Sequence, residues 1–120
     1  MASRGELEQR VLELLWAGTG PMTVAAVHRL LQEERDLAYT TVMTVLDRLA
    51  KKQLVGRELV GRAWEYVPAI GQEELVAGEL RESLESCPLE VQRQALRRFL
   101  EELPAELAKV AAEYAAVDQG

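Results

Sequence analysis

Apolar residues recur with a helical period in the first part of the chain. Leu7, Val11 and Leu15 are spaced by four residues, which predicts an amphipathic helix that ends at a Gly-Thr-Gly-Pro segment. Thr23 is the expected N-cap of a second helix, and Met22 and Thr23 are expected to form a short extended segment. The helices predicted in this region cover about residues 6–17, 24–35 and 38–52.

The pattern changes after the third helix. Two short segments, 54–60 and 63–67, are rich in β-branched and aromatic residues, and Gly61-Arg62 lies between them. This arrangement predicts a β-hairpin whose second strand ends at Pro68. The hairpin would place Arg62 at its tip.

Helical periodicity returns from Gly71 onward. One helix is expected over 72–86, with Leu75, Val76, Leu80 and Leu84 facing inward, and two more are expected to begin at Pro88 and Pro104. The fold class predicted is therefore α-rich α+β. We expect two domains, over residues 1–70 and 71–120.

The charge is divided unevenly between these two parts. The chain has 120 residues and a net charge of -6. Residues 1–70 hold nine basic and nine acidic residues, whereas 71–120 hold five basic and eleven acidic ones. Residues 48–62 carry five cations and only Glu58 as an anion, which favours a nucleic-acid contact there, although a solvated basic surface has the same composition.

Composition excludes several classes of protein. Cys87 and His28 are the single cysteine and histidine, so neither an internal disulfide nor a Cys/His metal site is available. No constellation of catalytic residues appears, and we expect neither a cofactor nor enzymatic activity. No segment has the roughly 18 uninterrupted apolar residues of a membrane span, and no hydrophobic signal core is present. We therefore expect a cytoplasmic protein that does not insert into a membrane.

The third helix presents a polar face that is suited to DNA. Val42, Leu46 and Leu49 fall on one side, while threonines and cations fall on the other. Threonine hydroxyls can bond phosphates or base edges, and Arg48 and Lys51 can contact phosphate. Three helices followed by a hairpin with a cationic tip are typical of a winged helix-turn-helix, in which the wing contacts DNA beside the recognition helix. A winged helix that binds protein, with the acidic helices as a scaffold, is the alternative.

Residues 39–52, YTTVMTVLDRLAKK, closely resemble the recognition helix of the BlaI/MecI penicillinase-repressor family. The resemblance extends to Glu6–Trp16, Val24–Leu31 and the wing segment Arg62–Tyr66, and continues more weakly to the C-terminal helices. It implies a repressor that binds double-stranded operator DNA with inverted TACA/TGTA-type half-sites. The residues that it places at DNA are Tyr39, Thr40, Thr41, Met43, Thr44, Arg48, Lys51 and Lys52, with Arg57 and Arg62 in the wing.

The resemblance also implies a homodimer held by the C-terminal helices. Their apolar residues exceed what packing onto a small N-terminal domain requires, although folding back onto that domain is an alternative. The residues expected to pair with a second subunit are Val76, Leu80, Leu84, Leu96, Phe99, Leu100, Leu103, Leu107, Val110 and Tyr114.

In many systems of this family a membrane sensor metalloprotease detects a β-lactam, and the repressor is then cleaved in its dimerisation half. The matching bond here is Arg98–Phe99, although the family often has Asn at the position of Arg98. Gln53 occupies a position where the family usually has Gly, which predicts a strained or reshaped turn into the wing. Copper-responsive relatives carry a C-terminal cysteine cluster that this chain lacks.

Overall fold

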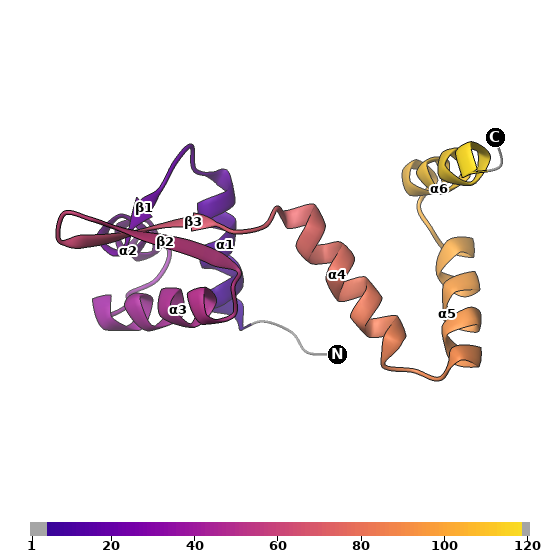
Figure 1. The fold of residues 1–120 in the computed structure, drawn as a ribbon, viewed down its shortest axis with the longest axis horizontal. Coiled ribbons are helices and arrows are strands. Elements are labelled where there is room, and N and C mark those ends of the chain that lie inside the picture. The colour runs from indigo at the N-terminus through magenta and orange to yellow at the C-terminus, as the bar shows by residue number, and fades with distance from the viewer. Residues whose placement is uncertain (1–4, 119–120) are drawn as a thin grey trace. The chain divides into compact units, whose positions relative to one another are not determined.

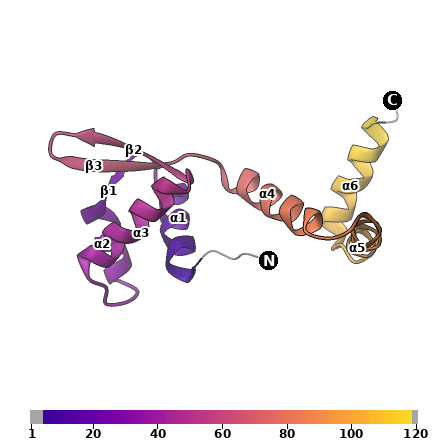
Figure 2. The same ribbon diagram turned by 60° about the horizontal axis from the view of Figure 1, so that its bottom comes forward.

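The computed structural model describes residues 5–118 of the chain. Figures 1 and 2 show helices and a hairpin in the order that the sequence predicts. The elements are α1 (Glu6–Ala17), β1 (Met22–Thr23), α2 (Val24–Gln32), α3 (Tyr39–Lys51), β2 (Val55–Val60), β3 (Ala63–Pro68), α4 (Gln72–Glu85), α5 (Leu89–Glu101) and α6 (Ala105–Asp118). The predicted α-rich α+β fold with a winged helix-turn-helix is confirmed.

The three strands form one antiparallel sheet in the order β1-β3-β2. Met22 pairs with Tyr66, and β2 and β3 pair from Val55 with Pro68 to Val60 with Ala63. Gly61 has a φ of 64° at the first position of the two-residue turn, as a type II′ hairpin requires. Both views show the hairpin extending as an arm past helices α2 and α3 (Figures 1 and 2).

The hydrophobic core lies among α1, α2, α3 and the inner end of the hairpin. Tyr66, on β3, is 2% exposed and closes the core on the side of the sheet. Val45 is also buried, in addition to the three inward positions that the sequence predicts for this helix. The buried residues are Val11, Leu12, Leu15, Val24, Val27, Leu31, Val42, Val45, Leu46, Leu49, Val55 and Tyr66.

Two local interactions explain where the helices begin and end. The hydroxyl oxygen of Thr23 accepts a hydrogen bond from the backbone N–H of Ala26 at 3.1 Å, which confirms Thr23 as the N-cap of α2. Helix α2 ends at Gln32 rather than near residue 35, and a closing turn follows in which the N–H groups of Glu34 and Arg35 share the carbonyl of Leu31.

The chain divides into two compact units, one up to Val76 and one from Ala77 onward. Helix α4 therefore begins in the first unit, where Leu75 packs against the core and Trp16 Nε1 donates to the carbonyl oxygen of Ile70 at 3.0 Å. None of the described residues of α4 or α5 is buried. The expectation that Val76 and Leu80 face inward is wrong for the single chain, in which both are exposed. No helix within residues 5–118 is long and apolar enough to cross a bilayer.

Candidate nucleic-acid interface

Helix α3 is packed on one side and open on the other. Val42, Leu46 and Leu49 are buried at a helical spacing, so the opposite side of the helix is turned outward. Met43, on that outward side, is 44% exposed even though it is apolar. We call the exposed residues Thr40, Thr41, Met43, Thr44, Arg48 and Lys51 the recognition face.

The threonines of the recognition face are not equivalent. Thr44 Oγ1 donates a hydrogen bond of 2.9 Å to the carbonyl oxygen of Thr40, one turn earlier in the helix. The Thr44 hydroxyl proton is therefore already used, and its oxygen remains available as an acceptor. Within residues 5–118 the side chains of Thr40 and Thr41 have no hydrogen-bond partner, so their hydroxyls can donate outward.

The start of α3 is held by the helix before it. His28, on α2, places its Nε2 2.7 Å from the carbonyl oxygen of Leu37, and its ring meets the Tyr39 ring edge-on with centroids 5.7 Å apart. These contacts fix the connection between α2 and α3 and the first residue of the recognition helix. Tyr39 nevertheless keeps 47% of its surface exposed.

The predicted DNA-contacting cations fall into two groups. Lys51 and Arg57 both pair with Asp47, and Lys52 Nζ lies 2.8 Å from Glu8 Oε1. Arg48 and Arg62 have no ion pair or hydrogen bond within the described part of the chain. Two of the five cations are therefore free to meet an anion, while three already have a carboxylate partner.

Asp47 is the shared partner of two of the paired cations, Lys51 and Arg57. Its Oδ2 is 3.0 Å from Lys51 Nζ and its Oδ1 accepts from Arg57 Nη1 at 3.2 Å. The hydrogen bond from Lys51, and then the charge of Arg57, hold the pKa of Asp47 below its ordinary value. Sequence reasoning placed Asp47 on the polar side of the helix but missed its role, although its i, i+4 spacing to Lys51 was a usable signal.

The two faces of the hairpin differ in charge. The strand register places Arg57 opposite Tyr66 and Leu59 opposite Trp64, and these four side chains share one face. Arg57 lies over the Trp64 ring, 4.7 Å from its centroid. The other face carries Glu58 directly opposite Glu65. One face of the wing thus carries the cation and the aromatic rings, and the other carries the carboxylates.

The turn between α3 and the wing has the strain that its sequence predicts. Gln53 has a φ of 64°, in the left-handed region. Its N–H bonds to the carbonyl of Ala50, and the N–H of Leu54 bonds to that of Leu49, each at 3.0 Å, which is the hydrogen-bond pattern of a Schellman motif. The turn therefore keeps the shape that glycine would adopt without strain.

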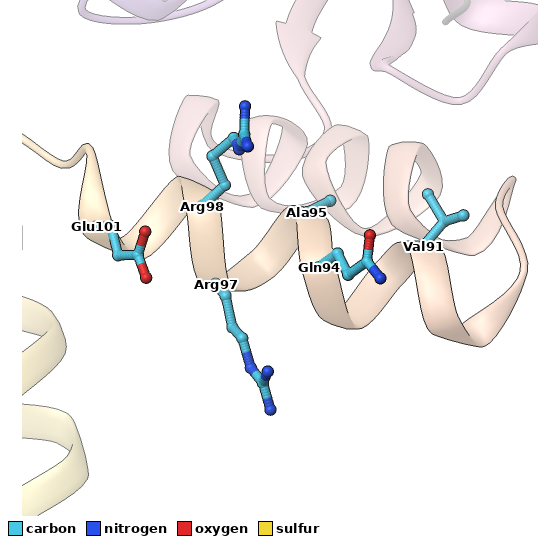
Figure 3. A pocket seen from close by; sticks show the side chains of 6 residues that line it. All are labelled: Val91, Gln94, Ala95, Arg97, Arg98 and Glu101. Carbon is cyan, nitrogen blue, oxygen red and sulfur yellow. The ribbon is translucent and has the colours of Figure 1, made fainter.

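The expected cleavage bond lies inside a helix. Arg98–Phe99 is in the last turn of α5, and the carbonyl of Arg98 accepts from the N–H of Glu102 at 3.1 Å. Figure 3 shows a shallow hollow lined only by residues of α5, with Arg97 and Arg98 extending to opposite sides of the helix in this view. Phe99 is 49% exposed, and the neighbouring side chains of Leu96 and Leu100 are exposed to a similar extent.

No group of three or more His, Cys, Asp or Glu residues within 5–118 is placed to hold a metal ion. Cys87 is half-buried, and its sulfur lies 3.9 Å from the carbonyl oxygen of Ser83 and 3.7 Å from the hydroxyl of Ser86. It makes local contacts at the junction of α4 and α5.

Comparison with known proteins identifies relatives over most of the chain. A sequence profile of the penicillinase repressor family matches residues 4–114. The transcriptional regulator BlaI of Mycobacterium tuberculosis, in strains CDC 1551 and H37Rv, is 49% identical over 105 residues, which cover 87% of this chain and 76% of the relative.

Two solved structures share the fold of the first unit. The solution structure of the DNA-binding domain of the repressor BlaI has a TM-score of 0.54 at 24% identity, covering 60% of this chain and 87% of that domain. The monomeric form of Bacillus licheniformis BlaI in complex with the blaP half-operator has a TM-score of 0.51 at 23% identity, covering 61% of this chain and 88% of that one.

Proposed function

The chain belongs to the penicillinase repressor family, and we propose that it is a homodimeric repressor that binds inverted-repeat operator DNA through α3. The relatives are regulators of transcription and not enzymes. The half-sites that the resemblance implies are of the TACA/TGTA type. The structure of a relative with a half-operator supports DNA as the partner class.

The observation that carries the proposal is the recognition face itself. A helix packed by Val42, Leu46 and Leu49 turns hydroxyl, methyl and guanidinium groups outward together. Such groups match the major groove, where a hydroxyl can bond base edges, a methyl can contact thymine and an arginine can bond guanine. Arg48 in the helix and Arg62 at the tip of the wing then contact phosphates or bases without first giving up an internal partner.

Dimerisation is supported by the exposed apolar side chains of the second unit. Leu80, Leu96 and Leu100 are each about half exposed in the single chain. So many exposed apolar side chains favour aggregation of a monomer, whereas in a dimer they can be buried in the interface. A two-fold dimer presents two α3 helices to half-sites about one or more helical turns apart, which raises both affinity and specificity.

Release from DNA would follow from cutting the second unit. In our proposal a membrane sensor metalloprotease cleaves Arg98–Phe99, which separates α6 and the end of α5 from the rest. Because proteases bind their substrates in extended form, the last turn of α5 must open first, and its exposed position makes that opening easy. The remaining fragment would lose part of the dimer interface and bind DNA weakly.

The test is fluorescence anisotropy of the full chain with a duplex that carries TACA/TGTA inverted repeats and with a scrambled duplex. We expect the repeat duplex to bind at least about a hundredfold more tightly than the scrambled one. Equal binding, or none to either, would overturn the proposal and favour a protein-binding module. Sedimentation of the full chain and of its Leu100→Asp variant tests the dimer: the variant should sediment as a monomer.

A further inference from the structure

The wing and the recognition helix are joined through one acidic side chain. Asp47 of α3 accepts a hydrogen bond of 3.2 Å from Arg57 of β2. Within residues 5–118 this is the only ion pair between α3 and the hairpin. Because Arg57 lies in the wing and Asp47 in the helix, the pair spans the two elements that are proposed to contact DNA.

Arg57 is also held by the hairpin itself. Its guanidinium stacks on Trp64, 4.7 Å from the ring centroid, and the neighbouring Tyr66, followed by the charge of Asp47, raises its pKa above the ordinary value. Turning the guanidinium towards a phosphate would break the contacts with Asp47 and Trp64. Arg57 is therefore better placed to connect the wing to α3 than to contact DNA.

Towards its tip, the described part of the wing has no residue buried in the core. All residues from Arg57 to Trp64 are exposed, whereas Tyr66 is buried in the core. Beyond Arg57, β2 continues for three residues to Val60, which is about 10 Å of extended strand, and the turn with Arg62 follows. A tilt of about 10° at Arg57 would then displace the tip by about 2 Å, which is enough to break a hydrogen bond to phosphate.

We propose that Asp47 is a positioning residue, which acts through Arg57 to set the direction of the wing relative to the recognition helix and so the distance between their DNA contacts. This inference rests on the proposed function. A carboxylate beside the recognition face repels phosphate, so Asp47 weakens binding through its charge alone. Its positioning effect and its charge effect therefore have opposite signs, and this makes them separable by experiment.

The first measurement is a double-mutant cycle on the full chain with the inverted-repeat and scrambled duplexes. We expect Asp47→Asn and Arg57→Gln each to weaken binding to the repeat duplex about fivefold, and the double variant to be no weaker than either single one. Binding of Asp47→Asn to the scrambled duplex should be unchanged or tighter. The slope of log affinity against log salt for the repeat duplex should stay within half a unit of wild type in Arg57→Gln.

Tighter or unchanged binding of Asp47→Asn to the repeat duplex would overturn the inference, because charge alone would then explain Asp47. A slope lowered by about one in Arg57→Gln would also overturn it and make Arg57 a direct phosphate contact. Failure of the proposed function is distinguishable, since wild-type protein would then not discriminate between the duplexes.

The second measurement needs no DNA. Residual dipolar couplings of backbone N–H groups report the orientation of β2 and β3 relative to α3. We expect Asp47→Asn to change this orientation and Lys51→Gln to leave it as in wild type, because Lys51→Gln removes the other ion pair of Asp47 and retains Arg57. An unchanged orientation in Asp47→Asn would overturn the inference whatever the result with DNA.

Discussion

The carboxylate of Glu8 lies 2.8 Å from Nζ of Lys52, so the first turn of α1 is joined to the C-terminal end of the recognition helix. The Glu8 side chain is only 12% exposed, whereas that of Lys52 is 51% exposed. The anion is thus fixed and the cation is the mobile partner. In the proposed interface, Glu8 of the free protein competes with a DNA phosphate for Lys52.

Glu8→Gln is therefore expected to strengthen binding to any DNA duplex. Loss of the carboxylate frees Lys52 and removes a repulsive charge near the backbone, which should tighten binding about threefold and steepen the salt dependence. Fluorescence anisotropy over a series of salt concentrations measures both effects. Glu113→Gln is the matched control, since it removes the same charge from α6. Equal tightening in the two variants would show that net charge alone is responsible.

The free cations should contribute most to the salt dependence. Arg48→Ala and Arg62→Ala are each expected to reduce the slope of log affinity against log salt by about one, because each removes a phosphate contact. Lys51→Ala should have a smaller effect, because Lys51 gives up its pairing with Asp47 on binding. Arg93→Ala, an exposed change in α5, serves as the control. A slope in Arg48→Ala that equals that of Arg93→Ala would place Arg48 outside the interface.

The boundaries of helices and strands were predictable because their signals are local. The spacing of Val42, Leu46 and Leu49, the cap at Thr23 and the turn at Gly61 depend only on neighbours in the sequence, and the structure confirms them. The end of α2 is the exception, since it lies three residues before the predicted one. The family was predictable for the same reason, since the fourteen residues 39–52 that carry the resemblance are contiguous.

The partners of the cations were not predictable in this way. Glu8 and Lys52 are 44 positions apart, and Asp47 meets Arg57 only because the hairpin folds back along α3. Such pairs depend on how α1 and β2 pack against α3, which periodicity does not report. The assignment of all ten predicted residues to DNA contact stays a prediction. Among the cations, those without an ion pair in the described residues, Arg48 and Arg62, are expected to contribute most.

The Arg10–Glu34 ion pair should make stability depend on pH. The hydrogen bond from Arg10, 2.8 Å from its Nε, lowers the pKa of Glu34 from its ordinary 4.5. Because the folded pKa is the lower one, the pair stabilises the fold above about pH 4.5 and loses this effect as the pH falls through the folded pKa. Glu34→Gln should therefore lower the melting temperature slightly at pH 7 and match wild type once the pH is below the folded pKa of Glu34.

Glu33→Gln is the control for that measurement, because Glu33 is exposed and has no ion pair within the described residues. It should follow wild type across the pH range. A difference between Glu34→Gln and wild type that persists unchanged at low pH would contradict the assignment, since the effect would then come from packing and not from charge.

Glycine is expected to be the more stable residue at both positions of residues 5–118 that have a positive φ. Gln53 and Gly61 each have a φ of 64°. A side chain strains this backbone conformation, so Gln53→Gly should raise the free energy of unfolding by about 1 kcal/mol and Gly61→Ala should lower it by about the same amount. A Cβ at Gly61 would meet nothing within 4 Å, so the loss there would come from the backbone alone. Urea unfolding measures both changes, with Gly20→Ala as the control, because that site is equally open and has no positive φ. If Gln53→Gly lowers stability, the Gln53 side chain makes a contribution larger than the strain it causes, and the loss of that side chain explains the result.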